Sequence, residues 1–253
     1  MESYFDRTIQ ALGQETFDHL QRVRVILFGA GGVGGWCAEA LVRSGVKHLT
    51  IVDFDVVNPS NINRQVVATR DNIGAPKVKE LQKRLLAINP DAEITTINQR
   101  YSAQTAETFD FNSYDYVLDA IDSVKDKALL LYRASLSHAT VFSSMGAGRK
   151  MDTTAVRVTA FKKVEGCPLA RAVRHQLKAL NLQLQTSNIQ LPTSNFQLPI
   201  PSDRALGLRT SNILCVWSPE LSSASGTLAP VVMTFGSALA NFVIRDIASQ
   251  DAK

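Results

Sequence analysis

The feature that most constrains the fold is a glycine-rich turn, Gly29-Ala30-Gly31-Gly32-Val33-Gly34, between a strand-like run and a helix-like run. The run before it, residues 22–28, is rich in β-branched and apolar residues, which predicts a buried strand. The run after it, residues 32–44, has helical spacing and is closed by a glycine. A strand–turn–helix unit of this kind lets a phosphate approach the turn and meet the N–H groups of the helix start. We therefore predict a nucleotide-binding turn that includes Gly29, Gly31, Gly32 and Gly34.

Strand-like and helix-like segments alternate through the first 150 residues. Further strands are predicted at residues 49–53, 94–97, 116–119 and 140–143, and a further helix at residues 76–89. This alternation is typical of a doubly wound, mostly parallel sheet, so the fold class is α/β and Rossmann-like. A helical segment over residues 1–21 precedes the sheet. After residue 150 we expect a C-terminal extension with strands at 155–161 and 213–217, a basic helix at 169–180 and an apolar helix at 229–247.

A polar tandem repeat interrupts this extension. Residues 186–192 (TSNIQLP) are almost duplicated by residues 193–199 (TSNFQLP). Because the repeat has neither helical nor strand periodicity, we predict a mobile surface insertion at residues 181–211 with no catalytic role.

The three cysteines, Cys37, Cys167 and Cys215, are far apart and form no CxxC pair. This spacing argues against a disulfide framework and a structural zinc site, and it favours a cytoplasmic location. Residues 1–21 are charged throughout, so we expect no secretory signal there. Polar and charged residues interrupt the end of the apolar helix at 229–247, which predicts a buried helix and no firm membrane association.

Residues beyond the glycine turn distinguish the candidate nucleotides, because the turn alone does not separate NAD, FAD and ATP. Asp53 ends the second strand, where it can accept hydrogen bonds from ribose hydroxyls. Arg64, in Asn61-Ile62-Asn63-Arg64-Gln65, and Lys77 would neutralise charge on an attacked α-phosphate and on departing pyrophosphate. Either cation alone would be read as surface charge, but the pair favours an ATP-cleaving enzyme over an NAD-dependent dehydrogenase.

Two carboxylates follow the strand at residues 116–119, in Asp119-Ala120-Ile121-Asp122. Ligands bind at the carboxyl ends of parallel strands, and Mg²⁺ prefers oxygen ligands that it shares with phosphate. We predict that Asp122 lies beside the metal and that Asp119 supports it. The competing interpretation is that Asp122 caps the next helix.

In this order, GAGGVG, IVDFD, NINRQ, Lys77 and DAID resemble the ubiquitin-activating enzyme superfamily, over about residues 5–148. Its bacterial, ThiF-type members adenylate the C-terminus of sulfur-carrier proteins. The resemblance implies ATP and Mg²⁺ as cofactors and a homodimer in which Arg7 reaches the triphosphate of the opposite subunit. It makes Arg64, Lys77, Asp122 and Arg7 catalytic, with Asp122 linked to the metal. The nucleotide is assigned to the glycines and to Asp53, Asp55, Asn61, Arg64, Gln65, Lys77, Asp119 and Asp122.

The C-terminal part lacks the two CxxC pairs that sulfur-carrier activators usually have, and it resembles the family of tRNA threonylcarbamoyladenosine dehydratases. The shared elements are SMGAG at 144–148, KMDTTAVRVTAF at 150–161, PLA-x-x-VR at 168–174 and CVWSPE at 215–220. This resemblance implies one adenylation domain over residues 1–253. Residues 1–150 would be its nucleotide-binding core, and residues 151–253 its substrate- and tRNA-facing extension.

Basic residues are concentrated between residues 162 and 209. Seven basic and two acidic residues give this segment a charge of +5, while the rest of the chain sums to −1. Such a surplus suits a polyanionic partner as well as a solvated face. With the resemblance, it implies a tRNA-facing surface formed by Lys162, Lys163, Arg171, Arg174 and Lys178.

The resemblance also implies a reaction. The threonine carboxylate of the modified adenosine would attack the α-phosphate of ATP and expel pyrophosphate, and the acyl-adenylate would then cyclise with release of AMP and net loss of water. Because the second attack is intramolecular, no protein nucleophile is required. The alternatives are an adenylyltransferase for the C-terminus of a sulfur-carrier or ubiquitin-like protein, an NAD-dependent oxidoreductase, and a non-catalytic tRNA-binding or scaffold protein. The sequence identifies no sulfur-relay protein partner.

Overall fold

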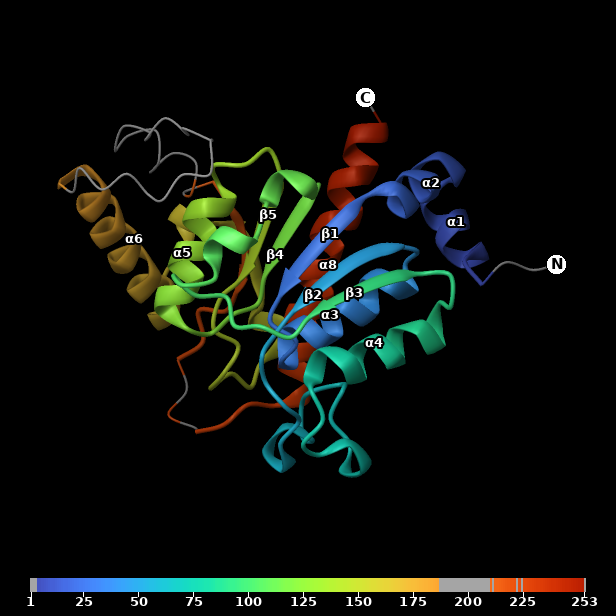
Figure 1. The fold of residues 1–253 in the computed structure, drawn as a ribbon, viewed down its shortest axis with the longest axis horizontal. Coiled ribbons are helices and arrows are strands. Elements are labelled where there is room, and N and C mark those ends of the chain that lie inside the picture. Colours follow the sequence, from blue (N-terminus) through green and yellow to red (C-terminus); the bar gives the residue numbers. More distant parts are fainter. Residues whose placement is uncertain (1–3, 187–209, 211, 222, 224, 253) are drawn as a thin grey trace.

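A seven-stranded sheet with the strand order β3-β2-β1-β4-β5-β7-β6 forms the centre of the fold (Figure 1). The computed structural model describes residues 4–186, 210, 212–221, 223 and 225–252. All neighbouring strands are parallel except β6 and β7, which are antiparallel. The strands are β1 (Arg24–Phe28), β2 (His48–Val52), β3 (Glu93–Ile97), β4 (Tyr116–Asp119), β5 (Thr140–Ser144), β6 (Arg157–Ala160) and β7 (Leu214–Trp217).

Helices cover both faces of this sheet. The helices of the described residues are α1 (Asp6–Leu12), α2 (Gln14–Arg22), α3 (Gly32–Arg43), α4 (Lys77–Ile88), α5 (Val124–Ala134), α6 (Pro168–Thr186) and α8 (Ala229–Asp251). Short 3-10 helices lie in the connections: η1 (Pro59–Asn61), η2 (Arg70–Asn72), η3 (Ala106–Thr108), η4 (Phe111–Ser113), η5 (Thr153–Ala155) and η6 (Phe161–Lys163).

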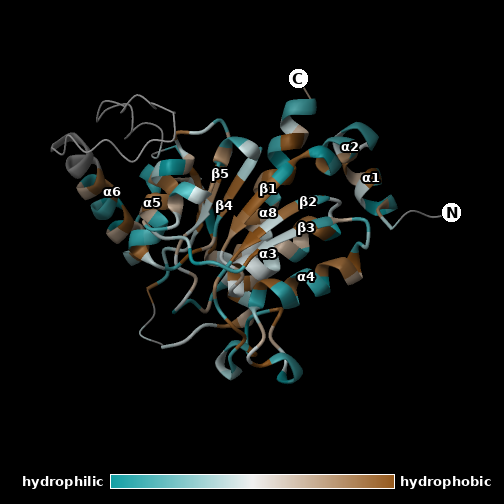
Figure 2. Ribbon diagram, viewed as in Figure 1, coloured by the Kyte–Doolittle hydropathy of each residue, from teal (hydrophilic) through white to brown (hydrophobic). Residues whose placement is uncertain are grey.

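The two faces of the sheet support two separate hydrophobic cores, because successive side chains of a strand point to opposite faces. In β1, Val25 and Leu27 pack with residues of α3, α4 and α8, whereas Ile26 and Phe28 pack with residues of α5 and α6. Four of the five β1 residues are buried, and the central strands are predominantly hydrophobic (Figure 2). This burial on both faces explains the continuous apolar run that the sequence shows there.

Helix α8 packs closely against α3 on one face of the sheet. A Cβ atom at Gly236 would lie 2.6 Å from the Val33 carbonyl oxygen, so only glycine permits this approach of the two helices. Among the described helices, α8 is the one long and apolar enough to cross a membrane. Its residues Val231, Phe235 and Leu239 are fully buried in the core, which is the packing of a core helix.

The predicted α/β class and the mostly parallel sheet are confirmed, with each predicted strand present within two residues of its expected ends. Two helical predictions need correction. The N-terminal segment forms two helices, α1 and α2, separated at Gly13, and the basic helix predicted at 169–180 continues to Thr186 as α6. Most of the predicted insertion at 181–211, including the second copy of the repeat, lies outside the described residues.

The strand order creates one crevice at the edge where the parallel strands end. The chain adds β2 and β3 on one side of β1 and then returns to place β4 on its other side. The connections after β1 and β4 therefore leave the sheet in opposite directions. In open α/β sheets, ligands bind at this switch point, beyond the carboxyl ends of the strands.

Candidate nucleotide-binding site

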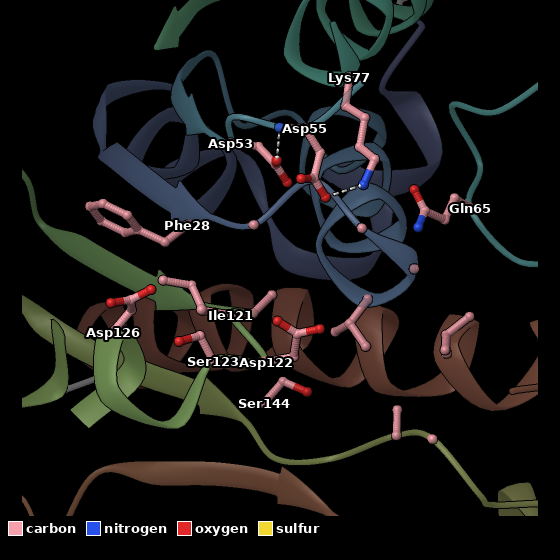
Figure 3. Close-up of a pocket in the computed structure, with 18 of the residues that line it drawn as sticks. Phe28, Asp53, Asp55, Gln65, Lys77, Ile121, Asp122, Ser123, Asp126 and Ser144 are labelled. Atoms are coloured by element: carbon pink, nitrogen blue, oxygen red, sulfur yellow. Dashed lines mark hydrogen bonds and ion pairs between the residues drawn. The ribbon is translucent and has the colours of Figure 1, made fainter. Parts of the chain in front are cut away.

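A cavity of about 720 Å³ opens at this switch point. Its walls come from the glycine turn after β1, the connection from the end of β2 to α4, the segments that follow β3, β4 and β5, and the start of α8. Figure 3 shows Asp53, Asp55 and Lys77 on one side of the cavity, facing Asp122, Ser123 and Ser144 on the other. Ten of the predicted ligand residues line this one cavity: Gly29, Gly31, Gly32, Asp53, Asp55, Asn61, Arg64, Gln65, Lys77 and Asp122.

The glycines of the turn have different roles. Gly29 has a φ of 95°, and a Cβ there would lie 2.8 Å from the Ala120 carbonyl oxygen. A Cβ at Gly34 would lie 1.7 Å from the Gly29 carbonyl oxygen, so Gly34 permits the start of α3 to close on β1. Gly31 lines the cavity, and the nearest heavy atom to a Cβ there would be 4.0 Å away. Gly29 and Gly34 therefore shape the turn, and Gly31 leaves the approach to it open.

Asp53 ties the end of β2 to the glycine turn. One carboxylate oxygen accepts a hydrogen bond from the Ala30 N–H at 2.6 Å, and the other accepts from the Asp55 N–H at 2.8 Å. Figure 3 shows the Asp53 side chain at the cavity wall beside Asp55. The carboxylate therefore orders the backbone around it and retains lone pairs for a ribose hydroxyl.

Lys77 begins α4 and turns its ammonium group into the cavity wall. Its side chain is 5% exposed, and Nζ lies 2.7 Å from Asp55 Oδ2, whose side chain is 46% exposed. Lys77 and Asp55 both line the cavity, so an anion bound there could form a charge-assisted hydrogen bond with the Lys77 ammonium group. Lys77 is thus a cation held ready at the cavity.

Arg64 lies in the connection between β2 and α4. One of its guanidinium nitrogens donates to the Ser60 carbonyl oxygen at 2.7 Å and to Asn63 Oδ1 at 2.8 Å. Its own carbonyl oxygen accepts a bond from the Trp36 ring N–H at 3.2 Å, which attaches this connection to α3. Arg64 lines the cavity, and a guanidinium group has further N–H donors beyond the nitrogen that makes these two bonds.

Two buried polar atoms of the cavity lining have no hydrogen-bond partner among the described residues. They are Gln65 Oε1 and the Tyr101 hydroxyl, in side chains that belong to residues 7% and 3% exposed. Burial raises the pKa of the Tyr101 hydroxyl, so this group stays a neutral donor. Unpaired buried polar atoms are rare in folded proteins. The Tyr101 ring packs against Phe28 and Phe109, so of the two atoms Gln65 Oε1 is the better candidate for a bond to a polar ligand.

The two aspartates after β4 occupy different environments. Asp122 is exposed and lines the cavity, and the residue at the N-cap of α5 is Ser123, which leaves the capping interpretation of Asp122 without support. Asp119 is fully buried, lies outside the cavity lining and pairs with Lys127 at 2.5 Å. Asp119 therefore contacts the protein interior, and its expected support of a ligand can act only through neighbouring residues.

Arg7 lies far from the cavity of its own chain. It is exposed on α1, where it donates to the Gln10 side chain at 3.2 Å, and α1 buries none of its residues. Helices α1 and α2 lead into the amino end of β1, whereas the cavity is at the carboxyl end (Figure 1). The fold of a single chain therefore does not bring Arg7 to the cavity, and the sequence resemblance assigns Arg7 to the triphosphate of the opposite subunit instead.

The segment directly after β3 contributes lining residues that the motifs did not reveal. Arg100 pairs with Asp126 at 2.7 Å, and its guanidinium lies 5.5 Å from the ring centroid of Phe54. Gln99 and Tyr101 line the cavity on either side of it. Their position after a parallel strand was a usable signal, because ligand-contacting residues gather at that edge.

The cysteines are all buried. Burial raises the pKa of the Cys37 and Cys215 thiols, which disfavours the nucleophilic thiolate. Within the ranges that the structure describes, no three His, Cys, Asp or Glu side chains are grouped closely enough to hold a metal ion by themselves.

Four of the five cations assigned to a tRNA-facing surface are exposed on η6 and α6: Lys162, Lys163, Arg171 and Lys178. Arg174 is only partly exposed. It donates to the carbonyl oxygens of Phe161 and Val164, and its guanidinium lies 5.1 Å from the centroid of the Phe161 ring. Arg174 therefore fastens η6 to α6, and it is less available to a partner than the four exposed cations.

Comparison with known proteins places these features in a family context. The ThiF family model matches residues 5–252. The tRNA threonylcarbamoyladenosine dehydratase 2 of Saccharomyces cerevisiae is 39% identical over 172 residues, which are 67% of this chain and 38% of the relative. The tRNA threonylcarbamoyladenosine dehydratase of Escherichia coli is 34% identical over 175 residues, which are 69% of this chain and 65% of the relative. The matches thus span less than two thirds of the length of both relatives.

Solved structures extend the likeness over nearly the whole chain. The E. coli tRNA N6-threonylcarbamoyladenosine dehydratase in complex with AMP has a TM-score of 0.85 and 29% identity, and the match covers 99% of this chain and 96% of that one. The same E. coli enzyme in complex with ATP has a TM-score of 0.83 and 30% identity, with 98% and 95% covered.

Proposed function

This chain belongs to the ThiF family, and from that premise we propose that it uses ATP to dehydrate and cyclise N6-threonylcarbamoyladenosine in tRNA. The observation that carries the proposal is the convergence of Gln65, Lys77, Asp53 and Asp122 on one cavity at the switch point. The full-length likeness to a dehydratase solved with AMP and with ATP supports the same conclusion. The enzyme would be an ATP-dependent, carboxylate-adenylating ligase.

ATP is the nucleotide that the cavity suits best. The glycine turn and the start of α3 would bind phosphate through backbone N–H groups and the positive end of the helix dipole. Asp53 would accept a hydrogen bond from a ribose hydroxyl. The amide oxygen of Gln65, which has no hydrogen-bond donor among the described residues, would accept a bond from the nucleotide. Lys77 and Arg64 would stabilise negative charge on the α-phosphate and on the pyrophosphate leaving group.

The donor set also suits Mg²⁺. This ion is usually held by one or two carboxylates together with phosphate oxygens and water, so a single cavity-facing carboxylate is enough. Asp122 is that carboxylate on the wall opposite Lys77 (Figure 3). When bound, the ion would neutralise phosphate charge, and Asp122 would keep its carboxylate oriented toward the phosphates.

The chemistry requires no nucleophile from the protein. The carboxylate of the threonylcarbamoyl group attacks the α-phosphate, the bond to pyrophosphate breaks, and an acyl-adenylate forms. Attack from within the same group on the activated carbonyl then expels AMP and closes the ring. Because this step is intramolecular, proximity replaces a thiol. The buried cysteines of the described chain agree with such a route.

We further propose a homodimer and a tRNA-binding surface. Arg7 is exposed and remote from its own cavity, so a second copy is the route by which it would meet a triphosphate. Lys162, Lys163, Arg171 and Lys178 form an exposed basic surface on η6 and α6 that suits the tRNA backbone. Residues 1–253 would act as one adenylation domain, since β6 and β7 of the extension complete the sheet of the core.

The test is direct. The purified protein is incubated with Mg·ATP and tRNA that carries threonylcarbamoyladenosine, and the digested nucleosides are weighed by mass spectrometry. ATP-dependent loss of one water from that nucleoside would support the proposal. An unchanged nucleoside, in protein that binds ATP, would refute it and point to the carboxyl terminus of a carrier protein as the group activated.

A further inference from the structure

A closed network of polar groups lies beneath the cavity. Lys127 in α5 and Asp119 at the end of β4 have completely buried side chains, with 2.5 Å between Lys127 Nζ and Asp119 Oδ2. The Ser143 hydroxyl donates to the same carboxylate oxygen at 2.6 Å. Lys127 also donates to the Ser144 carbonyl oxygen at 2.8 Å. The network therefore joins β4, α5 and β5 behind the cavity wall.

This network is attached to both loops that form one wall of the cavity. The second carboxylate oxygen of Asp119 accepts from the Ile121 N–H at 3.0 Å, which fixes residues 120–123. The bond from Lys127 to Ser144 fixes the beginning of residues 144–148. Both segments line the cavity, and Figure 3 shows Ile121, Asp122, Ser123 and Ser144 gathered on the same wall.

Stability alone does not account for a buried ion pair in this place. Transfer of two charges out of water carries a desolvation penalty, and apolar residues of similar volume often replace such pairs without loss of stability. The surroundings here are apolar, since Ala128, Leu130 and Leu131 of α5 are fully buried. In contrast, a fully satisfied polar network fixes bond directions and so specifies a single arrangement of the segments that it joins.

We propose that Lys127 is a positioning residue, which acts through Asp119 and Ser144 to hold the loops that present Asp122 and residues 144–148 to the nucleotide. The expected effect on the rate of AMP formation rests on the proposed function, whereas the expected effect on the rigidity of the two loops rests on the structure alone. A misplacement of about 1 Å in such a wall can lower a rate by about 100-fold. Loss of the network should therefore affect kcat much more than the affinity for ATP.

The experiment compares wild-type protein with the double variant Asp119→Asn/Lys127→Met, which removes both charges together and so avoids an unpaired buried ion. Amide hydrogen exchange at residues 120–123 and 144–148 should become about tenfold faster, while the sheet strands keep their protection. AMP formation should fall about tenfold or more, with the KM for ATP within about threefold of wild type. Ser143→Ala, a milder change in the same network, should shift both readouts in the same direction.

The matched control is Glu39→Gln/Arg84→Met, which removes a charged pair between α3 and α4 outside the cavity lining, with an Arg84 Nε–Glu39 Oε2 distance of 2.6 Å. Glu39 also pairs with Arg43 at 2.9 Å, and Arg43 is left as a solvent-exposed cation in this variant. The control variant should leave exchange in both loops unchanged. Wild-type exchange in both loops and wild-type kcat in the folded double variant would overturn the inference. If the double variant does not fold, wild-type exchange in both loops together with wild-type kcat in Ser143→Ala would overturn the inference. Wild-type protein inactive on the modified tRNA would count against the proposed function, and hydrogen exchange would still decide the role of Lys127.

Discussion

The substitution Gly34→Ala isolates the role of the glycine turn in the fold. A Cβ atom at Gly34 would lie 1.7 Å from the carbonyl oxygen of Gly29 and 2.9 Å from its carbonyl carbon. Real Cβ atoms essentially never approach a heavy atom within 3.0 Å, so the two groups would have to separate by about 1.3 Å. Both lie on the backbone, and no side-chain rotation can relieve the clash.

The expected loss of stability follows from this displacement. Extra methyl groups that force backbone shifts in packed regions typically cost about 1–3 kcal/mol, and a backbone clash of this depth lies at the upper end. In a domain of this size, about 1 kcal/mol changes Tm by roughly 2–4 °C. We therefore expect the Tm of Gly34→Ala to fall by roughly 6–12 °C.

Gly31→Ala is the matched control, because the nearest atom to a Cβ there is 4.0 Å away. Its Tm should stay within about 2 °C of wild type, since no atom has to move. The new methyl group would narrow the approach to the turn, so ATP affinity measured by calorimetry should fall about tenfold or more. A Gly34→Ala protein with wild-type Tm in differential scanning calorimetry would refute the steric reasoning.

Three further predictions concern the cations. Lys77→Met should reduce AMP formation by about 100-fold or more, because it removes a buried cation from the cavity wall, and Lys79→Met on the solvent side of α4 should leave the rate unchanged. Similar rates of AMP formation in the two variants would contradict the role assigned to Lys77. Co-expression of differently tagged Arg7→Ala and Lys77→Met subunits should restore about a quarter of wild-type AMP formation, because half of the dimers are mixed and each mixed dimer has one complete site. No recovery of AMP formation would show that Arg7 does not act at the site of the opposite subunit. The double variant Arg171→Ala/Lys178→Ala should bind tRNA with a weaker salt dependence, and the slope of log affinity against log salt concentration should become shallower by about 1 to 2. An unchanged slope in a filter-binding assay would exclude both residues from the tRNA-binding surface.

Much of the sheet could be predicted from the sequence because its strands are buried on both faces. The five residues of β1 are nearly all apolar, and such a run between turn residues has few alternatives to a central strand. The glycine turn then indicated the site, since Gly29 and Gly34 permit contacts that no other residue allows. Local sequence and tertiary packing agree at these positions.

The roles of the two aspartates could not be separated from the sequence. Both follow β4, and the rule that ligands bind at strand ends applies equally to both. Asp119 is the last residue of β4 and points into the interior, where Lys127 and Ser143 satisfy its carboxylate. Lys127 lies eight residues away in a helix, so only the packing of α5 on the sheet reveals the pair.

In the proposed function, the protein activates the threonine carboxylate of its tRNA substrate by transferring AMP to it from ATP. The most direct measurement uses tRNA whose threonylcarbamoyladenosine carries ¹⁸O in the threonine carboxylate, with mass spectrometry of the phosphate-containing products. If the carboxylate attacks the α-phosphate, one ¹⁸O atom leaves with AMP and none appears in pyrophosphate. Label in inorganic phosphate, or AMP without label while the nucleoside loses water, would contradict the account.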